Sequence, residues 1–333
     1  MRATITAVIV THNGRQLLAS CLRALFAGSR LPDDVIVVDN ASTDDTASWL
    51  SRTYPDVRSD RCAVNLGFAA ANNRAIRASV STYVLTINND AEVAPDALAA
   101  AAAVLDSADP RTGAVMPTMV FAEAPHIIAC AGLEVFTNGV VRDAGMGVAI
   151  GGGREPYPIF GPSAGAALYR RAALDDVGLF DPAFVMYLED ADLAWRLRLR
   201  RWGTLAVPAA IVRHKVSATA GYGSPRKAYY LARNRWWCLL KNLPAPLLRR
   251  QTNDLARYDA AAVAYATLAG DRASLTGRRD AIGDLAAILQ ARARVQSRAT
   301  ASVDEIAPWL LPSPPLVATI RERRVVRSLV GAS

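Results

Sequence analysis

Three carboxylates occupy four positions of this chain, at Glu189, Asp190 and Asp192. An apolar run precedes them and four arginines follow, with a proline and a glycine flanking the whole segment. This order predicts a capped helix over about 190–202, with acids at its positive end and arginines at its negative end. Helix capping alone accounts for such a cluster. The alternative interpretation is that Asp190 is a general base held beside apolar surface.

Polar side chains also follow apolar runs that are typical of buried strands. The runs 5–10, 35–38 and 83–87 are nearly continuous, and segments of helical periodicity separate them. Strands that alternate with helices predict an α/β fold with a mostly parallel sheet, whose ligands bind at the carboxyl ends of the strands. The polar residues at the first two ends are Thr11, Asn13, Asp39 and Asn40. Such groups suit a nucleotide base and ribose, and turn chemistry explains any one of them equally well.

A metal site is a further hypothesis at the third strand end. Asn88, Asn89 and Asp90 follow the run 83–87, and a carboxylate there is suited to hold Mg²⁺ or Mn²⁺ between two phosphates. His214 is a second candidate ligand, although a lone histidine is usually structural. Neither the Gly-x-Gly-x-x-Gly fingerprint nor a phosphate-binding P-loop follows the first strand.

Composition places the chain among globular proteins. Its 333 residues are 52% hydrophobic and 20% charged, enough for one large domain or two. No run reaches the roughly 18 apolar residues of a membrane span. The first residues do not resemble a signal peptide, so we expect a cytoplasmic location. Four widely spaced cysteines without metal-ligand spacing predict buried free thiols.

Charge is distributed unevenly along the chain. Residues 1–212 contain 18 Lys/Arg and 22 Asp/Glu, a net charge of −4, whereas residues 213–333 contain 20 and 8, a net charge of +12. Basic and aromatic residues alternate within 226–241. This pattern fits an interfacial helix at an anionic membrane and fits core packing with a charged outer face about equally well. The glycine-rich stretch 137–161 is expected to be a mobile loop.

The motifs, taken in order, resemble those of the family 2 glycosyltransferases with a GT-A fold, a Rossmann-like sheet flanked by helices. The most similar members are bacterial rhamnosyltransferases. The resemblance covers about residues 4–216, and its segments are 8–13, 37–44, 65–68, 88–90, 178–181, 189–193 and His214. It implies a glycosyltransferase domain at 1–216 and a basic, mostly helical C-terminal extension at 217–333.

The resemblance also implies a role for each matching position. Residues that would contact the nucleotide-sugar are Thr11, Asn13, Asp39, Asn40, Asn65, Gly67 and Asn89. Asp90 and His214 would hold a divalent metal, Mg²⁺ or Mn²⁺, and Asp190 would be the catalytic base. Candidates for acceptor contacts are Tyr187, Glu189, Asp192 and Trp195. Asn88 is a departure, because the family usually has the first acid of its metal motif there.

The implied reaction is an inverting sugar transfer in cell-wall or surface polysaccharide synthesis. The expected donor is dTDP-rhamnose or a UDP-sugar, and the expected acceptor is a glycan or a polyprenyl-diphosphate-linked sugar. The basic extension would contact the inner face of an anionic membrane and not nucleic acid, and assembly into a homo-oligomer stays open.

Two other classes of protein also stay open. A nucleotidyltransferase acting on sugar phosphates would need a glycine and lysine loop near its start, which this sequence lacks. A non-enzymatic binder of anionic surfaces or nucleic acid would use the basic extension, but it gives no reason for Asp39, Asp90 and Asp190 to converge.

Overall fold

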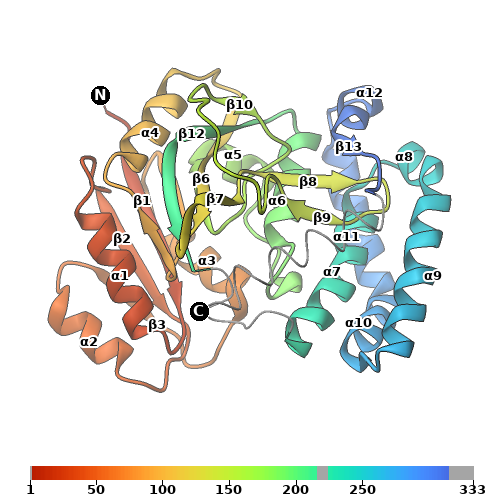
Figure 1. Ribbon diagram of the computed structural model, residues 1–333, viewed down its shortest axis with the longest axis horizontal. Coiled ribbons are helices and arrows are strands. Elements are labelled where there is room, and N and C mark those ends of the chain that lie inside the picture. Colours follow the sequence, from red (N-terminus) through yellow and green to blue (C-terminus); the bar gives the residue numbers. More distant parts are fainter. Residues whose placement is uncertain (1, 216–223, 315–333) are drawn as a thin grey trace.

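The computed structural model describes residues 2–215 and 224–314. The predicted domain boundary at 216/217 lies outside the described residues. A sheet of ten strands dominates the part before this boundary, and helices dominate the part after it (Figure 1). The predicted α/β fold with a helical C-terminal extension is confirmed.

Parallel strands form one half of the large sheet. They are β1 (Ile5–Thr11), β2 (Asp34–Asp39), β3 (Arg58–Arg61) and β4 (Tyr83–Asn88). The register pairs Thr11 with Asp39 across β1 and β2, and Val10 with Asn88 across β1 and β4. Because parallel strands end at the same edge, this register brings the polar residues that follow three strands close together.

Helices cover both faces of this sheet, which explains why its central strands are apolar throughout. The connecting helices are α1 (Arg15–Phe26), α2 (Thr46–Thr53), α3 (Gly67–Ala78) and α4 (Ala97–Ser107). Ile5, Ala7 and Ile9 of β1 share a core with α1 and α4. Val8 points to the other face and shares a second core with α3. These alternating directions follow from the two-residue period of a strand.

The other half of the sheet is mixed in direction. Its strands are β5 (Ala91–Val93), β6 (Thr112–Phe121), β7 (Ala124–Cys130), β10 (Tyr157–Pro158), β11 (Ala166–Arg170) and β12 (Gly203–His214). β11 lies antiparallel between β4 and β6, and β12 runs parallel to β6. β12 continues to His214 after an irregularity between Val207 and Ile211. Pro208 lies within this irregularity and has no N–H to donate.

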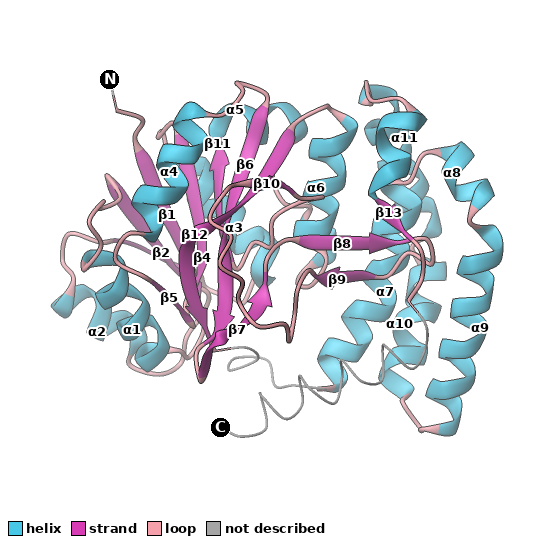
Figure 2. Ribbon diagram, turned by 45° about the horizontal axis from the view of Figure 1, so that its top comes forward, coloured by secondary structure: helices cyan, strands magenta, loops and turns pink. Residues whose placement is uncertain are grey.

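The stretch 137–161 is only partly irregular, which corrects the expectation of a loop. It contains β9 (Val141–Asp143), which pairs with β8 (Leu133–Phe136). β13 (Leu310–Leu311) adds a third strand from near the end of the described chain. Figure 2 shows this small sheet between the large sheet and the C-terminal helices.

Two short helices and a single turn complete the first part of the chain. α5 (Arg171–Val177) follows β11, the 3₁₀ turn η1 (Pro182–Phe184) follows α5, and α6 (Glu189–Leu199) follows η1. The predicted helix over 190–202 is therefore present and is three residues shorter at its end.

The C-terminal extension is a helical layer on one side of the molecule (Figure 1). Its helices are α7 (Pro225–Asn242), α8 (Ala245–Arg250), α9 (Thr252–Leu268), α10 (Arg272–Gly283), α11 (Leu285–Arg298) and α12 (Val303–Ile306). A third core joins this layer to the first part of the chain, with Phe184 and Trp195 on one side and Trp237 and Ile288 on the other.

Helix α7 resolves the two interpretations of the basic and aromatic segment. Trp237, Cys238 and Leu239 are buried, and the Trp237 ring meets the Phe184 ring edge-on at 6.2 Å. Core packing, and not an interfacial helix, therefore explains this segment. All four cysteines are buried and free, as predicted. Of the helices that the structure describes, none is long and apolar enough to cross a membrane.

Candidate active site

Asp39 ends β2 as a completely buried carboxylate. Its Oδ1 accepts a hydrogen bond from the Ser42 N–H at 2.8 Å. Its Oδ2 accepts no hydrogen bond from any described residue, although the exposed Arg61 lies 3.5 Å away as an ion pair. Buried polar atoms almost always have a hydrogen-bond partner, so this oxygen is suited to an N–H or O–H of a ligand.

Three asparagines near Asp39 hold the surrounding loops together. Asn13 Oδ1 accepts from the Thr43 N–H at 2.7 Å, and Asn40 Oδ1 accepts from the Leu66 N–H at 2.8 Å. Asn40 Nδ2 also donates to Asn65 Oδ1 at 3.1 Å. Loop fixation therefore accounts for these amides, and their predicted contact with a nucleotide stays a prediction.

Thr11 and Asn89 are buried against each other at the ends of β1 and β4. Asn89 Nδ2 donates to Thr11 Oγ1 at 3.0 Å. Gly14 leaves room for this amide, since a Cβ at that position would lie 2.4 Å from Asn89 Nδ2. Gly14 was not among the predicted site residues, although a glycine directly after a polar strand end was a usable signal.

Asp90 and His214 meet because β12 pairs with β5, which places His214 opposite Ala91. His214 Nε2 lies 3.1 Å from Asp90 Oδ1, and Asp90 is only 7% exposed. Across residues 2–215 and 224–314, no group of three or more His, Cys, Asp or Glu side chains gathers to hold a metal. A carboxylate oxygen and an imidazole nitrogen fit a divalent ion that takes its remaining ligands from a diphosphate.

Asp190 lies in the first turn of α6 and is partly exposed. Its Oδ2 accepts from the Ala164 N–H at 3.2 Å, and its Oδ1 accepts from the Ala191 N–H at 2.8 Å. Burial raises the pKa of Asp190 to about 6, the neighbouring Asp143 adds to the rise, and the two N–H groups oppose it. A carboxylate with this pKa is mostly ionised at pH 7 and is a stronger base than an ordinary aspartate.

A backbone contact at the end of β4 lies one residue from the partner of Asp190. The Asn88 N–H at the end of β4 donates to the Gly165 carbonyl at 2.9 Å, one residue after Ala164. Asp143 of β9 interacts electrostatically with both Asp190 and His214. Asp143 was not among the predicted site residues, because its glycine-rich surroundings carry no motif.

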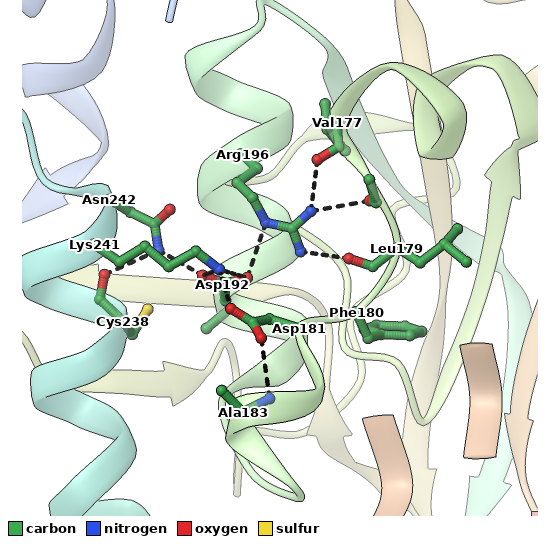
Figure 3. A network of polar contacts seen from close by, with 12 residues as sticks. Val177, Leu179, Phe180, Asp181, Ala183, Asp192, Arg196, Cys238, Lys241 and Asn242 are labelled. Carbon is green, nitrogen blue, oxygen red and sulfur yellow. Dashed lines mark hydrogen bonds and ion pairs between the residues drawn. The ribbon is translucent and has the colours of Figure 1, made fainter. Parts of the chain in front are cut away.

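The predicted acceptor contact of Asp192 is wrong, because this side chain cannot reach an acceptor. It is completely buried, and its oxygens accept from Arg196 Nε at 2.9 Å, Lys241 Nζ at 2.9 Å and Asn242 Nδ2 at 2.8 Å (Figure 3). Lys241 Nζ also donates to Asp181 at 2.6 Å. Burial alone would raise the pKa of Asp192, but Lys241 and Arg196 hold it below its ordinary value.

The predicted acceptor contact of Trp195 is also wrong. Its side chain is 1% exposed and meets the Phe160 ring edge-on at 5.0 Å inside the third core. A helix turns about 100° per residue, so α6 presents Asp190 on one side and directs Asp192 and Trp195 inward. The sequence alone did not indicate which side is covered.

Tyr187 and Glu189 stay candidates for acceptor contacts. Tyr187 is partly exposed, and the Lys227 Nζ lies 5.5 Å from its ring centre. Glu189 is 6% exposed, and its Oε2 has no hydrogen-bond partner in the described part of the chain. Burial, together with the charge of Asp190, raises the pKa of Glu189 well above its ordinary value.

Unusual backbone conformations precede α6. Val185, Tyr187 and Leu188 have φ values of 62°, 65° and 67°, in the region that favours glycine. Each such residue costs of order 1–3 kcal/mol and persists only where its surroundings impose it. Gly67 lets Val185 approach closely in this conformation, since a Cβ at position 67 would lie 2.6 Å from Val185 Cγ1.

A family model described as glycosyl transferase family 2 matches residues 6–178, just over half of the chain. The chain belongs to glycosyl transferase family 2. Membership sets aside the two alternative classes that the sequence left open and makes the protein a glycosyltransferase.

A curated relative supports the resemblance to rhamnosyltransferases. The chain is 28% identical over 249 residues to the N-acetylglucosaminyl-diphospho-decaprenol L-rhamnosyltransferase of Mycobacterium tuberculosis H37Rv. The alignment covers 66% of this chain and 78% of the relative.

Solved glycosyltransferase structures show the GT-A fold. A mannosyltransferase from Pyrobaculum calidifontis, in complex with GDP-Man and Mn²⁺, matches with a TM-score of 0.54 at 21% identity over 99% of this chain and 82% of that one. The structure of GalNAc-T7 with UDP, GalNAc and Mn²⁺ matches with a TM-score of 0.56 at 16% identity over 81% of this chain. The match spans 58% of the GalNAc-T7 chain.

Proposed function

We propose that this family 2 glycosyltransferase transfers a sugar, with rhamnose as the first candidate, from a nucleoside-diphosphate sugar to a glycan or a polyprenyl-diphosphate-linked sugar. Cell-wall or surface polysaccharide synthesis is the process that this reaction would serve. The observation that carries the proposal is Asp190, a partly exposed carboxylate at the start of α6 whose two oxygens are held by the N–H groups of Ala164 and Ala191, as suits a general base. The relative named as an N-acetylglucosaminyl-diphospho-decaprenol L-rhamnosyltransferase supports the choice of sugar and acceptor.

The proposed reaction is a single inverting displacement. Asp190 removes the proton from an acceptor hydroxyl while that oxygen forms a bond to the anomeric carbon of the donor sugar. The bond from this carbon to the nucleoside diphosphate breaks on the opposite face. A diphosphate is a good leaving group, so one base is sufficient and no protein nucleophile is needed.

The donor would bind at the edge formed by β1, β2 and β4. Asp39 Oδ2 is the acceptor proposed to recognise the nucleotide, because it is buried and accepts no hydrogen bond from the described side chains. The remaining proposed donor contacts are Thr11, Asn13, Asn40, Asn65, Gly67 and Asn89. The nucleotide is proposed to be dTDP or UDP.

Asp90 and His214 are the residues proposed to hold Mg²⁺ or Mn²⁺. When bound, the ion would neutralise negative charge on the diphosphate. Two structures of similar fold contain Mn²⁺. Since Asn88 replaces the first acid of the usual motif, this chain offers one carboxylate and one imidazole, and we expect weaker metal binding than with two carboxylates.

A lipid-linked acceptor implies work at a membrane, so we propose peripheral contact with its inner, anionic face. The net charge of +12 over residues 213–333 supports this contact. So do apolar side chains on the outer helices, since Tyr265, Leu268 and Ile282 are 66%, 89% and 74% exposed. Sedimentation with anionic vesicles should fall as salt rises, and binding that is absent at low salt would contradict the proposal.

The test of function is nucleotide release from a panel of donors. The purified chain is incubated with dTDP-rhamnose, UDP-sugars or GDP-sugars, with and without Mn²⁺ and an N-acetylglucosaminyl-diphospho-polyprenol. We expect release of dTDP or UDP that requires the acceptor and forms a glycosylated lipid. The proposal is overturned if no donor on the panel releases nucleotide and none raises the melting temperature of the protein.

A further inference from the structure

Asn234 of α7 is the residue from which this inference starts. It is completely buried in the helical extension, and its Nδ2 donates to three backbone carbonyls. These belong to Phe184 at 2.8 Å, Met186 at 2.9 Å and Tyr187 at 2.8 Å. A side-chain amide has two N–H groups, so this one shares its protons among all three carbonyls.

Arg233 fixes the direction in which this amide points. Arg233 Nη1 donates to Asn234 Oδ1 at 3.0 Å and to the Ala183 carbonyl at 2.8 Å. An oxygen that accepts from a guanidinium leaves the amide nitrogen to face the three carbonyls, which assigns the orientation of the Asn234 side chain.

The segment 184–188, which accepts these hydrogen bonds, directly precedes α6 and so sets where Asp190 lies. Val185, with φ 62° and ψ −61°, is the centre of a γ-turn that the Met186 N–H closes on the Phe184 carbonyl at 2.6 Å. Carbonyls in such a turn have no helix or sheet partner, and those of Met186 and Tyr187 need a donor from outside the segment or from solvent. Asn234 is that donor.

Helix α3 holds the opposite side of the same segment. The N–H groups of Phe68 and Ala69 donate to the Val185 carbonyl at 2.7 and 3.2 Å. The segment is therefore fixed between a helix of the first part of the chain and a helix of the extension. The residues that follow it directly are Glu189 and Asp190.

We propose that Asn234 is a positioning residue for sugar transfer, which sets the segment 184–188 so that the Asp190 carboxylate faces the acceptor oxygen. The inference rests on the proposed role of Asp190 as the base. It gives the extension a part in catalysis, because Asn234 belongs to α7 and would act through the backbone carbonyls to which it is bonded. A base that is displaced by about 1 Å loses of the order of 10²-fold in rate.

The variants are Asn234→Ala, which removes the amide N–H groups, and Asn234→Asp, which places a carboxylate against three carbonyl oxygens. Asn234→Ser retains one donor and is the alternative if neither folds. The matched control is Asn73→Ala, since Asn73 is equally buried and bonds to the Phe180 backbone at 2.7 and 3.0 Å, outside the segment.

We expect the Asn234 variants to lose roughly 10- to 100-fold in kcat with an unchanged KM for the donor. Their pH–rate profile should move away from the wild-type midpoint, because the surroundings of Asp190 change. Asn73→Ala should lose thermal stability and keep kcat and the pH profile. The inference is overturned if Asn234→Ala and Asn73→Ala lower kcat in the same proportion, or if the Asn234 variants lose stability alone.

Hydrogen exchange of the Met186 amide tests the same inference without any activity. This amide should exchange faster in Asn234→Ala than in the wild type and Asn73→Ala, because the γ-turn relaxes. Unchanged protection would overturn the positioning role even if sugar transfer is demonstrated. If the wild type transfers no sugar, the proposed function fails, and the exchange measurement still decides whether Asn234 holds the segment.

Discussion

The two halves of the candidate active site are built in different ways. At the edge of β1, β2 and β4, each polar residue stands where its own strand ends, and its hydrogen bonds reach nearby loops, as from Asn13 to Thr43. The acidic segment instead depends on α7, which lies about 50 residues further along the chain and reaches it through Asn234 and Lys241. The pattern of strand ends therefore locates the residues of the first half, whereas packing against α7 decides which side chains of the acidic segment are buried and paired.

The contrast is sharpest within α6 itself. Asp190 and Asp192 are two residues apart, yet burial raises the pKa of Asp190 and the cations of Lys241 and Arg196 lower that of Asp192. Side chains two residues apart on a helix point in directions that differ by about 200°. The cluster thus divides into one carboxylate suited to chemistry and one that joins the extension to the sheet.

Asp190→Asn should have the largest effect on activity. Removing a general base lowers kcat by about 10²–10⁴-fold, while the affinity for the nucleotide-sugar stays nearly unchanged because the donor edge is separate. Single-turnover kinetics and donor titration measure the two quantities. An equal loss of both would show that Asp190 is only a helix cap.

Asp192→Asn should have the largest effect on stability. It removes the carboxylate that Arg196 and Lys241 share and leaves Lys241 with Asp181 alone, which costs up to about 3–5 kcal/mol of unfolding free energy. Urea unfolding measures the loss, and Glu305→Gln, in the exposed pair with Arg201, is a control that should change little. Normal stability with loss of transfer would place Asp192 in the reaction instead.

The same variant should also change the acid sensitivity of the fold. The pKa of Asp192 is lowered in the folded state, so its stabilisation is complete above the unfolded value of about 3.9 and is lost as pH falls through the folded value. Urea midpoints measured at falling pH should therefore decline more for the wild type than for Asp192→Asn.

Asp39→Asn should weaken donor binding without affecting the chemical step. The hydrogen bond of a ligand to a buried carboxylate contributes about 1.5–3 kcal/mol, which corresponds to roughly 10- to 150-fold in the dissociation constant. Isothermal titration with dTDP- and UDP-sugars checks this value. Unaltered affinity would remove Asp39 from the nucleotide pocket and leave it as a partner of Ser42.

The pH dependence of transfer should show the smallest effect, a change of about tenfold per pH unit. Asp190 must be ionised to accept a proton, so the rate should fall as pH drops below the pKa of about 6 and level off above it. Initial rates at saturating donor give the profile. A flat profile through pH 6 would mean that another group takes the proton.

Much of the fold could be predicted from periodicity. The apolar runs correspond closely to β1, β2 and β4, because strands covered on both faces consist of apolar residues throughout. The small sheet of β8, β9 and β13 was not predictable, since it joins residues about 175 positions apart through backbone bonds that leave no side-chain pattern.

The sequence by itself determined the α/β class, the strand ends that carry Thr11, Asp39 and Asp90, and the helix start that carries Asp190. These follow from periods of 2 and 3.6 residues and from helix-end preferences, which are local properties. Only the tertiary structure decided that Asp192 and Trp195 face inward and that Asn234 holds the segment before Asp190. Those outcomes depend on which surface another helix covers, and burial by distant residues is not encoded in any local spacing.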